Sequence, residues 1–337
     1  MAERARAPRF APKIGIFLEL GKARLSALVV LTAVVGFVLA ARGPLDWGRL
    51  LWVCIGTALA ALGANALNEH LERERDRRML RTRRRPLPSG RLEPQHAVCF
   101  GLGAGVLGSA LLAVYVNAVA GLLASAATLL YVLVYTPLKT RTAASTLVGA
   151  VVGALPPLIG WSGAHGRLDP GAWGLAGVLL VWQIPHFLSL AWMYRVDYNR
   201  GGFRLLPVVD QSGALTACVV VVYALLLVVM SLSLVWAGEL GFVYAGGALA
   251  LGAGLVVLCV QLERRPSVSA ARRVFVASII YLPLLLGLMV MDRAVAQYWH
   301  RTGYPRLATD RLGVSRVDIP VHSAEQTRNQ TPAAVNG

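Results

Sequence analysis

Charge is scarce in this sequence, and acidic charge is the scarcest. The 337 residues include 17 Asp and Glu against 33 Lys and Arg, and charged residues make up only 15% of the chain. A soluble domain has roughly 25%. The chain is also 56% hydrophobic, with a mean hydropathy of +0.59. This composition excludes an ordinary soluble domain and predicts a protein that crosses a membrane several times.

Features of several other protein classes are missing too. None of the cysteines forms a CxxC pair. Each lies inside an apolar run, and we interpret each as a small buried residue. We find no Ser/His/Asp or Cys/His arrangement for covalent catalysis. The N-terminus has no hydrophobic region followed by a small-residue cleavage site. Basic residues are not interleaved with exposed aromatic residues, so we expect no nucleic-acid partner.

Nine apolar runs are each long enough to span a bilayer, which takes about 20 residues in a helix. They predict an all-α, polytopic membrane protein: a bundle of nine transmembrane helices around a central cavity open to the cytoplasmic side. The runs are 24–41, 48–68, 96–116, 118–135, 143–163, 172–194, 214–237, 241–262 and 273–291.

The loops between these runs alternate in charge. Those rich in Arg and Lys are 69–95, 136–142, 195–213 and 263–272. The positive-inside rule places them in the cytoplasm with the basic N-terminal segment, 1–23. We expect a membrane domain over 24–292, embedded in the lipid bilayer, and a polar, disordered tail over 293–337.

An amide and two carboxylates recur at helical spacing at the end of the second run. Asn68, Glu72 and Asp76 are spaced i, i+4 and i+8, so on a helix they lie within about 80° of one another. Oxygen ligands in a row suit Mg²⁺, and the arginines that follow suit a diphosphate. A solvated helix end with i+4 ion pairs is the alternative. It does not explain why Asn65 and Asn68 lie just inside an apolar span.

The sixth run carries polar residues in its interior. Gln183, Pro185 and His186 interrupt it, and a polar cluster inside a membrane is a functional candidate, although a lone His there is more often a core residue. Asp197 and Asp210 follow the run, at the membrane face where the first acidic stripe lies. We therefore expect the two acidic clusters to converge on one cavity.

Three groups of short motifs are similar to those of a known family. They are Asn68-xxx-Glu72-xxx-Asp76 with Met79, Arg81-Thr82 and Arg85-Pro86-Leu87; Tyr135-Thr136-xx-Lys139; and Trp182-Gln183-Ile184-Pro185-His186-Phe187 with Asp197-Tyr198 and Leu206-Pro207-Val208-Val209. From about Leu20 to Asp292 the chain resembles the UbiA-type membrane prenyltransferases. The third group resembles their haem O synthase branch rather than the quinone or chlorophyll branches.

The resemblance implies a fold, a reaction and a set of site residues. The fold is UbiA-like, and the reaction is Mg²⁺-dependent farnesyl transfer from farnesyl diphosphate to a vinyl group of protohaem IX, giving haem O. The metal and catalytic residues would be Asn68, Glu72, Asp76 and Asp197, with Lys139 as a further catalytic residue. The substrate-binding residues would be Asn65, Arg81, Arg85, Tyr135, Arg141, Gln183, His186 and Tyr198. For His186, both iron ligation and a hydrogen bond to a propionate remain open.

Two departures from the family pattern concern the metal site. Glu72 stands where Asp is commoner, and Val196 precedes Asp197 where a second acid is frequent. Either Asp210 compensates or a second Mg²⁺ site is weaker. The resemblance also implies a bacterial inner membrane, or a mitochondrial inner membrane in a eukaryote, and a downstream haem A synthase as partner. The alternatives are a quinone-type aromatic acceptor and a haem-binding carrier without chemistry.

Overall fold

The computed structural model describes residues 14–302, with side chains to residue 295, and every regular element in this part is helical. Nine of its helical segments are long and apolar enough to cross a membrane, as the sequence predicts. They are α2 (Ala23–Ala40), α3 (Trp47–Asp76), α4 (Pro94–Tyr115), the segment Ala118–Leu138, α7 (Ser145–His165), α8 (Pro170–Met193), α11 (Ala214–Trp236), α12 (Phe242–Arg264) and α13 (Val268–Thr302).

Most helix ends lie within a few residues of the predicted spans, and the exceptions matter for the site. The helix α3 does not end at residue 68 but continues to Asp76, so the acidic stripe lies on one unbroken helix. The short helix α1 (Ile14–Leu20) precedes the first span. At the other end, α13 continues beyond 292 to Thr302, so no helix ends at the expected start of the tail. Residues 1–13 and 303–337, including most of that tail, lie outside the described part.

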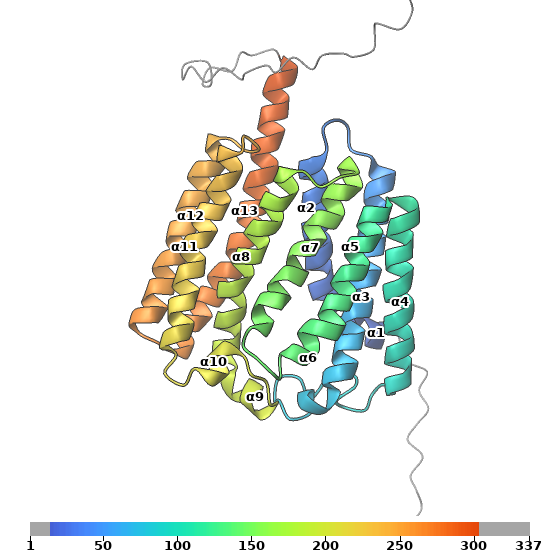
Figure 1. The fold of residues 1–337 in the computed structure, drawn as a ribbon, viewed down its shortest axis with the longest axis vertical. Helices are drawn as coiled ribbons and strands as arrows, with labels where there is room; N and C mark the ends of the chain where they lie inside the picture. Colours follow the sequence, from blue (N-terminus) through green and yellow to red (C-terminus); the bar gives the residue numbers. More distant parts are fainter. Residues whose placement is uncertain (1–13, 303–337) are drawn as a thin grey trace, which may run out of the picture. The chain divides into compact units, whose positions relative to one another are not determined.

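The helices pack side by side in chain order over much of the bundle. Figure 1 shows α3, α4 and α5 at one edge and α11 and α12 at the other, with α7 and α8 between them. The segment Ala118–Leu138 consists of α5 (Ala118–Leu129), a π-helical turn η1 (Leu130–Tyr135) and α6 (Thr136–Leu138). A π-helical turn inside an α-helix is frequent at functional sites. Here it carries Tyr131 and Tyr135.

The contact between α2 and α7 is close because glycines from both helices lie in it. A Cβ atom at Gly160 would overlap the carbonyl oxygen of Ala33, and one at Gly36 would overlap that of Pro157. Any larger side chain at either position would push the two helices apart. This contact packs the C-terminal half of α2 closely against α7.

Two loops meet at the end of the bundle where α3 stops. They are the basic loop 77–93, which follows α3, and the segment that contains α9 (Arg195–Arg200) and α10 (Leu206–Val209). Met79 from the first loop is buried against Ala191, Phe203 and Leu205. The backbone N–H of Arg204 also donates to the carbonyl oxygen of Lys139 at 2.7 Å. These contacts assemble three cytoplasm-predicted loops into one cap.

Candidate active site

The predicted oxygen stripe forms a buried row on α3. Its members are Asn68, Glu72 and Asp76. The Nζ of Lys139 lies 2.9 Å from Oε1 of Glu72, and Nη1 of Arg85 lies 2.7 Å from Oδ2 of Asp76. The sequence predicts all of these residues for one site, and the structure brings them together.

Lys139 holds its proton firmly in this setting. Burial alone would lower its pKa, but the Glu72 carboxylate, followed by Tyr135 and Tyr131, more than offsets this and leaves the pKa raised. Its ammonium lies 4.4 Å from the centre of the Tyr135 ring, a cation–π contact. Lys139 is therefore a fixed positive charge at neutral pH.

Arg85 and Asp76 form a second ion pair beside the first. Burial would lower the pKa of Arg85, but the charge of Asp76 and the hydrogen bond to it outweigh burial, and the pKa is raised. The other carboxylate oxygen of Asp76, Oδ1, is buried and has no hydrogen-bond partner among the described residues. An unpaired buried carboxylate oxygen is costly, so this atom is a natural place for a metal ion or a donor.

Lys22 is a site residue that the sequence reasoning missed. Its Nζ donates to Oδ1 of Asn68 at 2.9 Å, across 46 positions of the chain. Burial, then the positive charge of Arg85, lowers its pKa to about 7, despite the opposing charge of Glu72. Its backbone has φ 51°, the left-handed region that non-glycine residues rarely adopt. In the sequence it is one more basic residue before a span, and no spacing links it to α3.

Amide and hydroxyl groups connect the stripe to neighbouring helices. Nδ2 of Asn68 donates to Oγ1 of Thr136 at 3.0 Å. Nδ2 of Asn65 donates to Oγ of Ser26 at 3.2 Å, and the Tyr131 hydroxyl lies 3.5 Å from Oδ1 of Asn65. Asn65, predicted to bind substrate, is therefore occupied in linking α3 to α2.

Glu69 is a second residue that the prediction left out. It is 0% exposed, and its Oε1 accepts the backbone N–H of Leu87 at 3.1 Å. Its Oε2 has no partner among the described residues. The contact fastens the basic loop to α3 at the turn that follows Arg85. The signal in the sequence was an acid beside Asn68 that lies, around the helix, within about 20° of Asp76.

Asp197, from the second acidic cluster, contacts the loop that follows the acidic stripe. Its two carboxylate oxygens accept the backbone N–H groups of Leu80 and Arg81 at 3.3 and 3.1 Å. The guanidinium of Arg81 donates to the Tyr198 hydroxyl at 2.9 Å and lies over the ring of Tyr194, 5.0 Å from its centre. Asp197 thus organises the loop, whatever else it binds.

Asp210 does not compensate for Val196. Its carboxylate accepts the backbone N–H groups of Gly213 and Thr216 and the hydroxyls of Ser212 and Thr216, at the start of α11. Burial would raise its pKa, but these hydrogen bonds, led by that from the backbone of Thr216, leave it lowered. Because its oxygens cap a helix, the structure gives no support to the alternative that Asp210 completes a second metal site.

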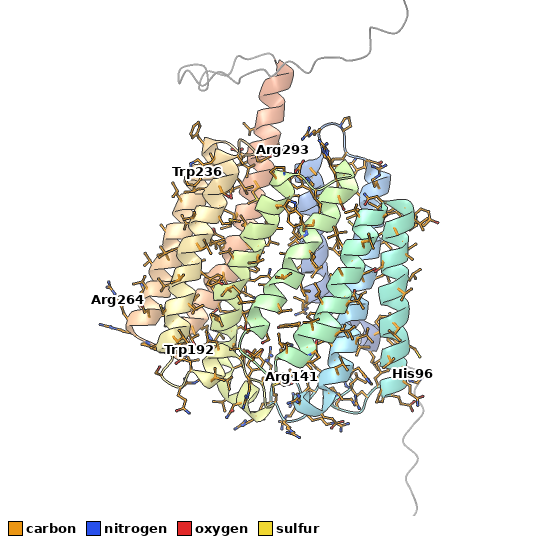
Figure 2. The ribbon with its side chains drawn as sticks, viewed as in Figure 1. His96, Arg141, Trp192, Trp236, Arg264 and Arg293 are labelled. Carbon is orange, nitrogen blue, oxygen red and sulfur yellow. The ribbon has the colours of Figure 1, made fainter. Side chains whose placement is uncertain are left out.

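Two more predicted substrate contacts lie elsewhere. Nε2 of Gln183 donates to the carbonyl oxygens of Ala150 and Leu179, at 3.3 and 3.0 Å, and so fills the α7–α8 contact beside Gly153. Arg141 is exposed and makes no side-chain hydrogen bond or ion pair to any described residue. Figure 2 shows it at the acidic-motif end of the bundle. Neither side chain joins the cluster around α3.

His186, three residues after Gln183 on α8, contacts α13 rather than α7. Its Nδ1 is 2.8 Å from Oγ of Ser278 on α13. The imidazole stacks on Trp182 and on Phe275, with ring centres 4.9 Å away in each case. His186 therefore faces α13 in an aromatic setting, separate from the ion pairs at the end of α3.

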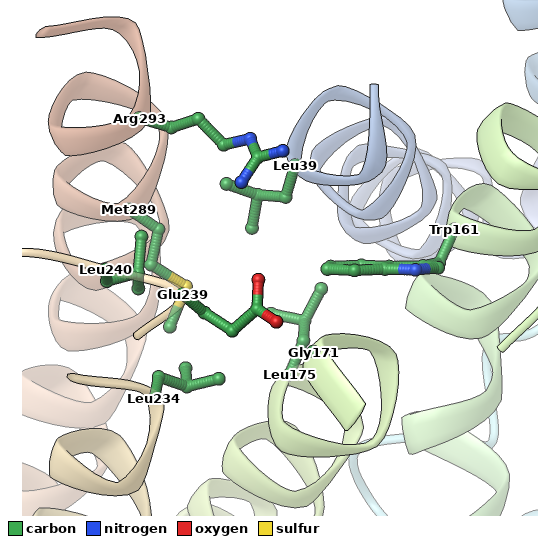
Figure 3. A pocket seen from close by; sticks show the side chains of 9 residues that line it. All are labelled: Leu39, Trp161, Gly171, Leu175, Leu234, Glu239, Leu240, Met289 and Arg293. Carbon is green, nitrogen blue, oxygen red and sulfur yellow. The ribbon is translucent and has the colours of Figure 1, made fainter. Parts of the chain in front are cut away.

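One pocket lies at the opposite end of the bundle. Figure 3 shows its lining: Leu39, Trp161, Gly171, Leu175, Leu234, Glu239, Leu240, Met289 and Arg293. Its space, part of it open to solvent, is about 270 Å³. None of the predicted site residues lines it, so it belongs to neither the acidic cluster nor His186. The central cavity expected at the cytoplasmic end stays a prediction.

A magnesium ion fits the residues of the stripe. All the side-chain atoms that could face it are oxygens, and one of them, Oδ1 of Asp76, is buried without a partner in the described part. No group of three or more His, Cys, Asp or Glu side chains among the described residues could hold a metal by itself. Mg²⁺ suits such a site because it binds through one or two carboxylates, waters and substrate phosphates.

The fold and this cluster define a class: a multi-pass membrane protein whose buried acids and cations face one end of a helical bundle. A profile of the UbiA prenyltransferase family matches residues 29–281. Protoheme IX farnesyltransferase of Salinibacter ruber is 43% identical over 276 residues, which cover 82% of this chain and 98% of that protein. The chain therefore belongs to the UbiA prenyltransferase family.

Other relatives support the same family, and solved structures show the same fold. Protoheme IX farnesyltransferase of Solibacter usitatus is 40% identical over 82% of this chain and 98% of its own length. The human mitochondrial protoheme IX farnesyltransferase is 41% identical over 82% of this chain and 62% of its own. A digeranylgeranylglyceryl phosphate synthase structure superposes with a TM-score of 0.70 at 18% identity, covering 83% and 98% of the two chains.

A further structure shows the same fold with ligands. A UbiA homolog from Archaeoglobus fulgidus, bound to GPP and Mg²⁺, has a TM-score of 0.58 at 14% identity and covers 81% of this chain and 99% of that one. At this identity the likeness establishes the fold alone. The predicted all-helical, UbiA-like architecture is confirmed.

Proposed function

We propose that this chain transfers a farnesyl group from farnesyl diphosphate to a vinyl group of protohaem IX, giving haem O and diphosphate. The observation that carries the proposal is the set of relatives about 40% identical over most of both chains, all named protoheme IX farnesyltransferase. The buried cation–carboxylate cluster supports it, because its cations suit a diphosphate. A haem A synthase would then use the product.

The cluster would bind and activate the diphosphate. Lys139 and Arg85 present fixed positive charges, and Lys22 adds a third that an incoming anion would stabilise by raising its pKa. When the C1–O bond of farnesyl diphosphate breaks, its electron pair leaves with the diphosphate. Preorganised cations lower the energy of that developing charge.

The stripe would also hold Mg²⁺. Asn68, Glu72 and Asp76 are the proposed ligands, with Asp197 as a further one that also organises the loop 77–93. A bound Mg²⁺ supplies charge neutralisation at the leaving diphosphate. Glu72 and Asp76 would exchange their Lys139 and Arg85 partners, fully or in part, for this role.

The acceptor needs no protein nucleophile. The π electrons of the vinyl group form the new C–C bond to C1 of the farnesyl group, and the cation left beside the porphyrin is captured by water, which then loses a proton. The protein's task is to hold the vinyl group near C1 and to delay water until that bond has formed. Aromatic residues around His186 offer a surface suited to a porphyrin.

The chain is a multi-pass membrane protein, and we place the active site on the cytoplasmic side. The basic loops lie at the end of the bundle that carries the acidic motif, where Figure 2 labels Arg141 and His96. This arrangement fits the positive-inside rule. A bacterial inner membrane would suit it, and a mitochondrial inner membrane in a eukaryote.

The test is a reaction with purified protein in detergent, farnesyl diphosphate, haem and Mg²⁺. Mass analysis of extracted haem should show one added farnesyl group plus water, with one diphosphate released per haem O formed. The Asp76→Asn variant serves as the inactive control. If diphosphate were released only with an aromatic quinone precursor, that precursor and not haem would be the acceptor. Haem binding with no diphosphate release would instead make the chain a carrier.

A further inference from the structure

We propose that Nε2 of His186 is an axial ligand of the haem iron during farnesyl transfer. This inference rests on the proposed function, because it concerns the way in which the acceptor is held. It selects one of the two roles that the sequence left open for His186, iron ligation or a hydrogen bond to a propionate.

The hydrogen bonds around Ser278 determine which ring nitrogen carries the proton. The Ser278 hydroxyl has a single proton, and it is donated to the carbonyl oxygen of Phe275 at 2.7 Å. With the hydroxyl proton assigned to Phe275, the 2.8 Å contact between Ser278 Oγ and Nδ1 of His186 uses a proton on Nδ1. In a neutral imidazole this leaves Nε2 with a lone pair and no proton.

Nε2 is also free to bind. It makes no hydrogen bond to any described residue, and it is not among the buried polar atoms that lack a partner. The atom is therefore not fully enclosed by the described residues. A hydrogen bond to a propionate needs a donor, and a neutral Nε2 has none. A lone pair on a neutral imidazole nitrogen is instead the usual ligand of haem iron.

The ring is held in a defined orientation. Trp182 and Phe275 stack on it with interplanar angles of 20° and 27°. Nε1 of Trp182 also donates to the backbone carbonyl of Ser278 at 2.9 Å, which ties α8 to α13 at this level. A metal-binding His commonly has its other nitrogen held by a hydrogen bond, which orients the ring and raises its basicity. Ser278 does this here.

The position along α8 suits an acceptor rather than a diphosphate. His186 precedes the end of α8 at Met193 by seven residues, which is roughly 10 Å along a helix. Asp197 and Tyr198, which contact the basic loop, lie just beyond that end. Haem ligated at His186 would thus lie deeper in the membrane than the diphosphate group.

The experiment compares haem with iron-free protoporphyrin IX, which has the same propionates but no metal. Both are titrated into the purified full-length chain, and binding is followed by the Soret band for haem and by fluorescence for the iron-free ring. The His186→Ala variant should lose haem affinity by at least tenfold and keep its affinity for protoporphyrin IX. Ser278→Ala should weaken haem binding by roughly tenfold, because a metal-bound His loses its orienting partner.

Two controls make the result decisive. Imidazole added to His186→Ala should restore a Soret spectrum like that of the unmodified chain. Arg264→Gln, a change at an exposed position at the end of α12, should bind both porphyrins normally. Equal losses for both porphyrins would assign His186 to a propionate, and unchanged binding of both would make it a packing residue; either result overturns the inference. If the unmodified chain bound neither porphyrin, the proposed function itself would fail.

Discussion

Lys139 and Glu72 face each other from two membrane-spanning segments that are far apart in the chain. Nζ of Lys139 lies 2.9 Å from Oε1 of Glu72, and both side chains are largely buried, 13% and 7% exposed. A buried pair of this kind becomes costly when one partner is removed, because the remaining charge has no solvent to stabilise it. The pair therefore serves as a structural link, and it is the contact that the proposed Mg²⁺ and diphosphate would replace.

The Lys139→Met variant should lower kcat by about 100-fold or more, because a preorganised charge is lost from the developing diphosphate. Diphosphate release by purified protein measures this. Arg264→Gln, at the end of α12, is the control and should keep its activity because Arg264 is exposed and makes no side-chain hydrogen bond or ion pair to any described residue. A Lys139→Met variant as active as this control would remove Lys139 from the site.

Asp76→Asn and Glu72→Gln should each reduce turnover by on the order of 100-fold or more, with the protein still inserted in the membrane. Each change removes one negative charge from the proposed Mg²⁺ site but keeps the size of the side chain. The apparent Mg²⁺ affinity of any residual activity should also fall. Near-normal activity in both variants would contradict the metal assignment.

Glu72→Asp tests the departure of this chain from the commoner Asp. If Glu72 binds the metal directly or through water, the shorter carboxylate should keep substantial activity. Its distance from Lys139 would increase by about one C–C bond, roughly 1.5 Å. Steady-state rates of Glu72→Asp and Glu72→Gln are compared side by side. An equally deep loss in both would show that the longer side chain is required.

Lys22→Met should raise KM for farnesyl diphosphate by about tenfold, because one charge-assisted contact to the anion would be lost. The KM for haem should change little, since haem is proposed to lie deeper. Arg24→Gln, near the same end of α2, is a control that removes a nearby charge with no hydrogen bond to Asn68. Equal effects from Lys22→Met and Arg24→Gln would indicate a general loss of positive charge.

The start of α11 should weaken in acid. Hydrogen bonds to the Asp210 carboxylate hold its folded-state pKa below the unfolded value of about 3.9. The stabilisation is therefore complete above that value and is lost as pH falls through the lower, folded-state pKa. Asp210→Asn should reduce the thermal stability of the detergent-solubilised protein at pH 7. The difference from the unmodified chain should shrink toward pH 3. A difference that grows in acid would contradict the assigned direction.

The amino-acid sequence alone was enough to predict the membrane spans and the acidic stripe. Apolar runs must become helices in a bilayer because every backbone group needs an internal partner. The spacing of Asn68, Glu72 and Asp76 then puts them on one face, since 3.6 residues make a turn. These properties are local, and the structure confirms each of them.

Only the tertiary structure showed which residues meet the stripe. Lys22 reaches Asn68 from 46 positions away, and Glu69 holds Leu87 through a loop. The oxygens of Asp210, which looked equivalent to those of Asp197, are occupied at a helix start. Contacts between distant segments depend on how helices pack and loops fold back, and no local spacing encodes them. The sequence therefore determined the helices and the chemistry of their faces, and packing decided which charges share a site.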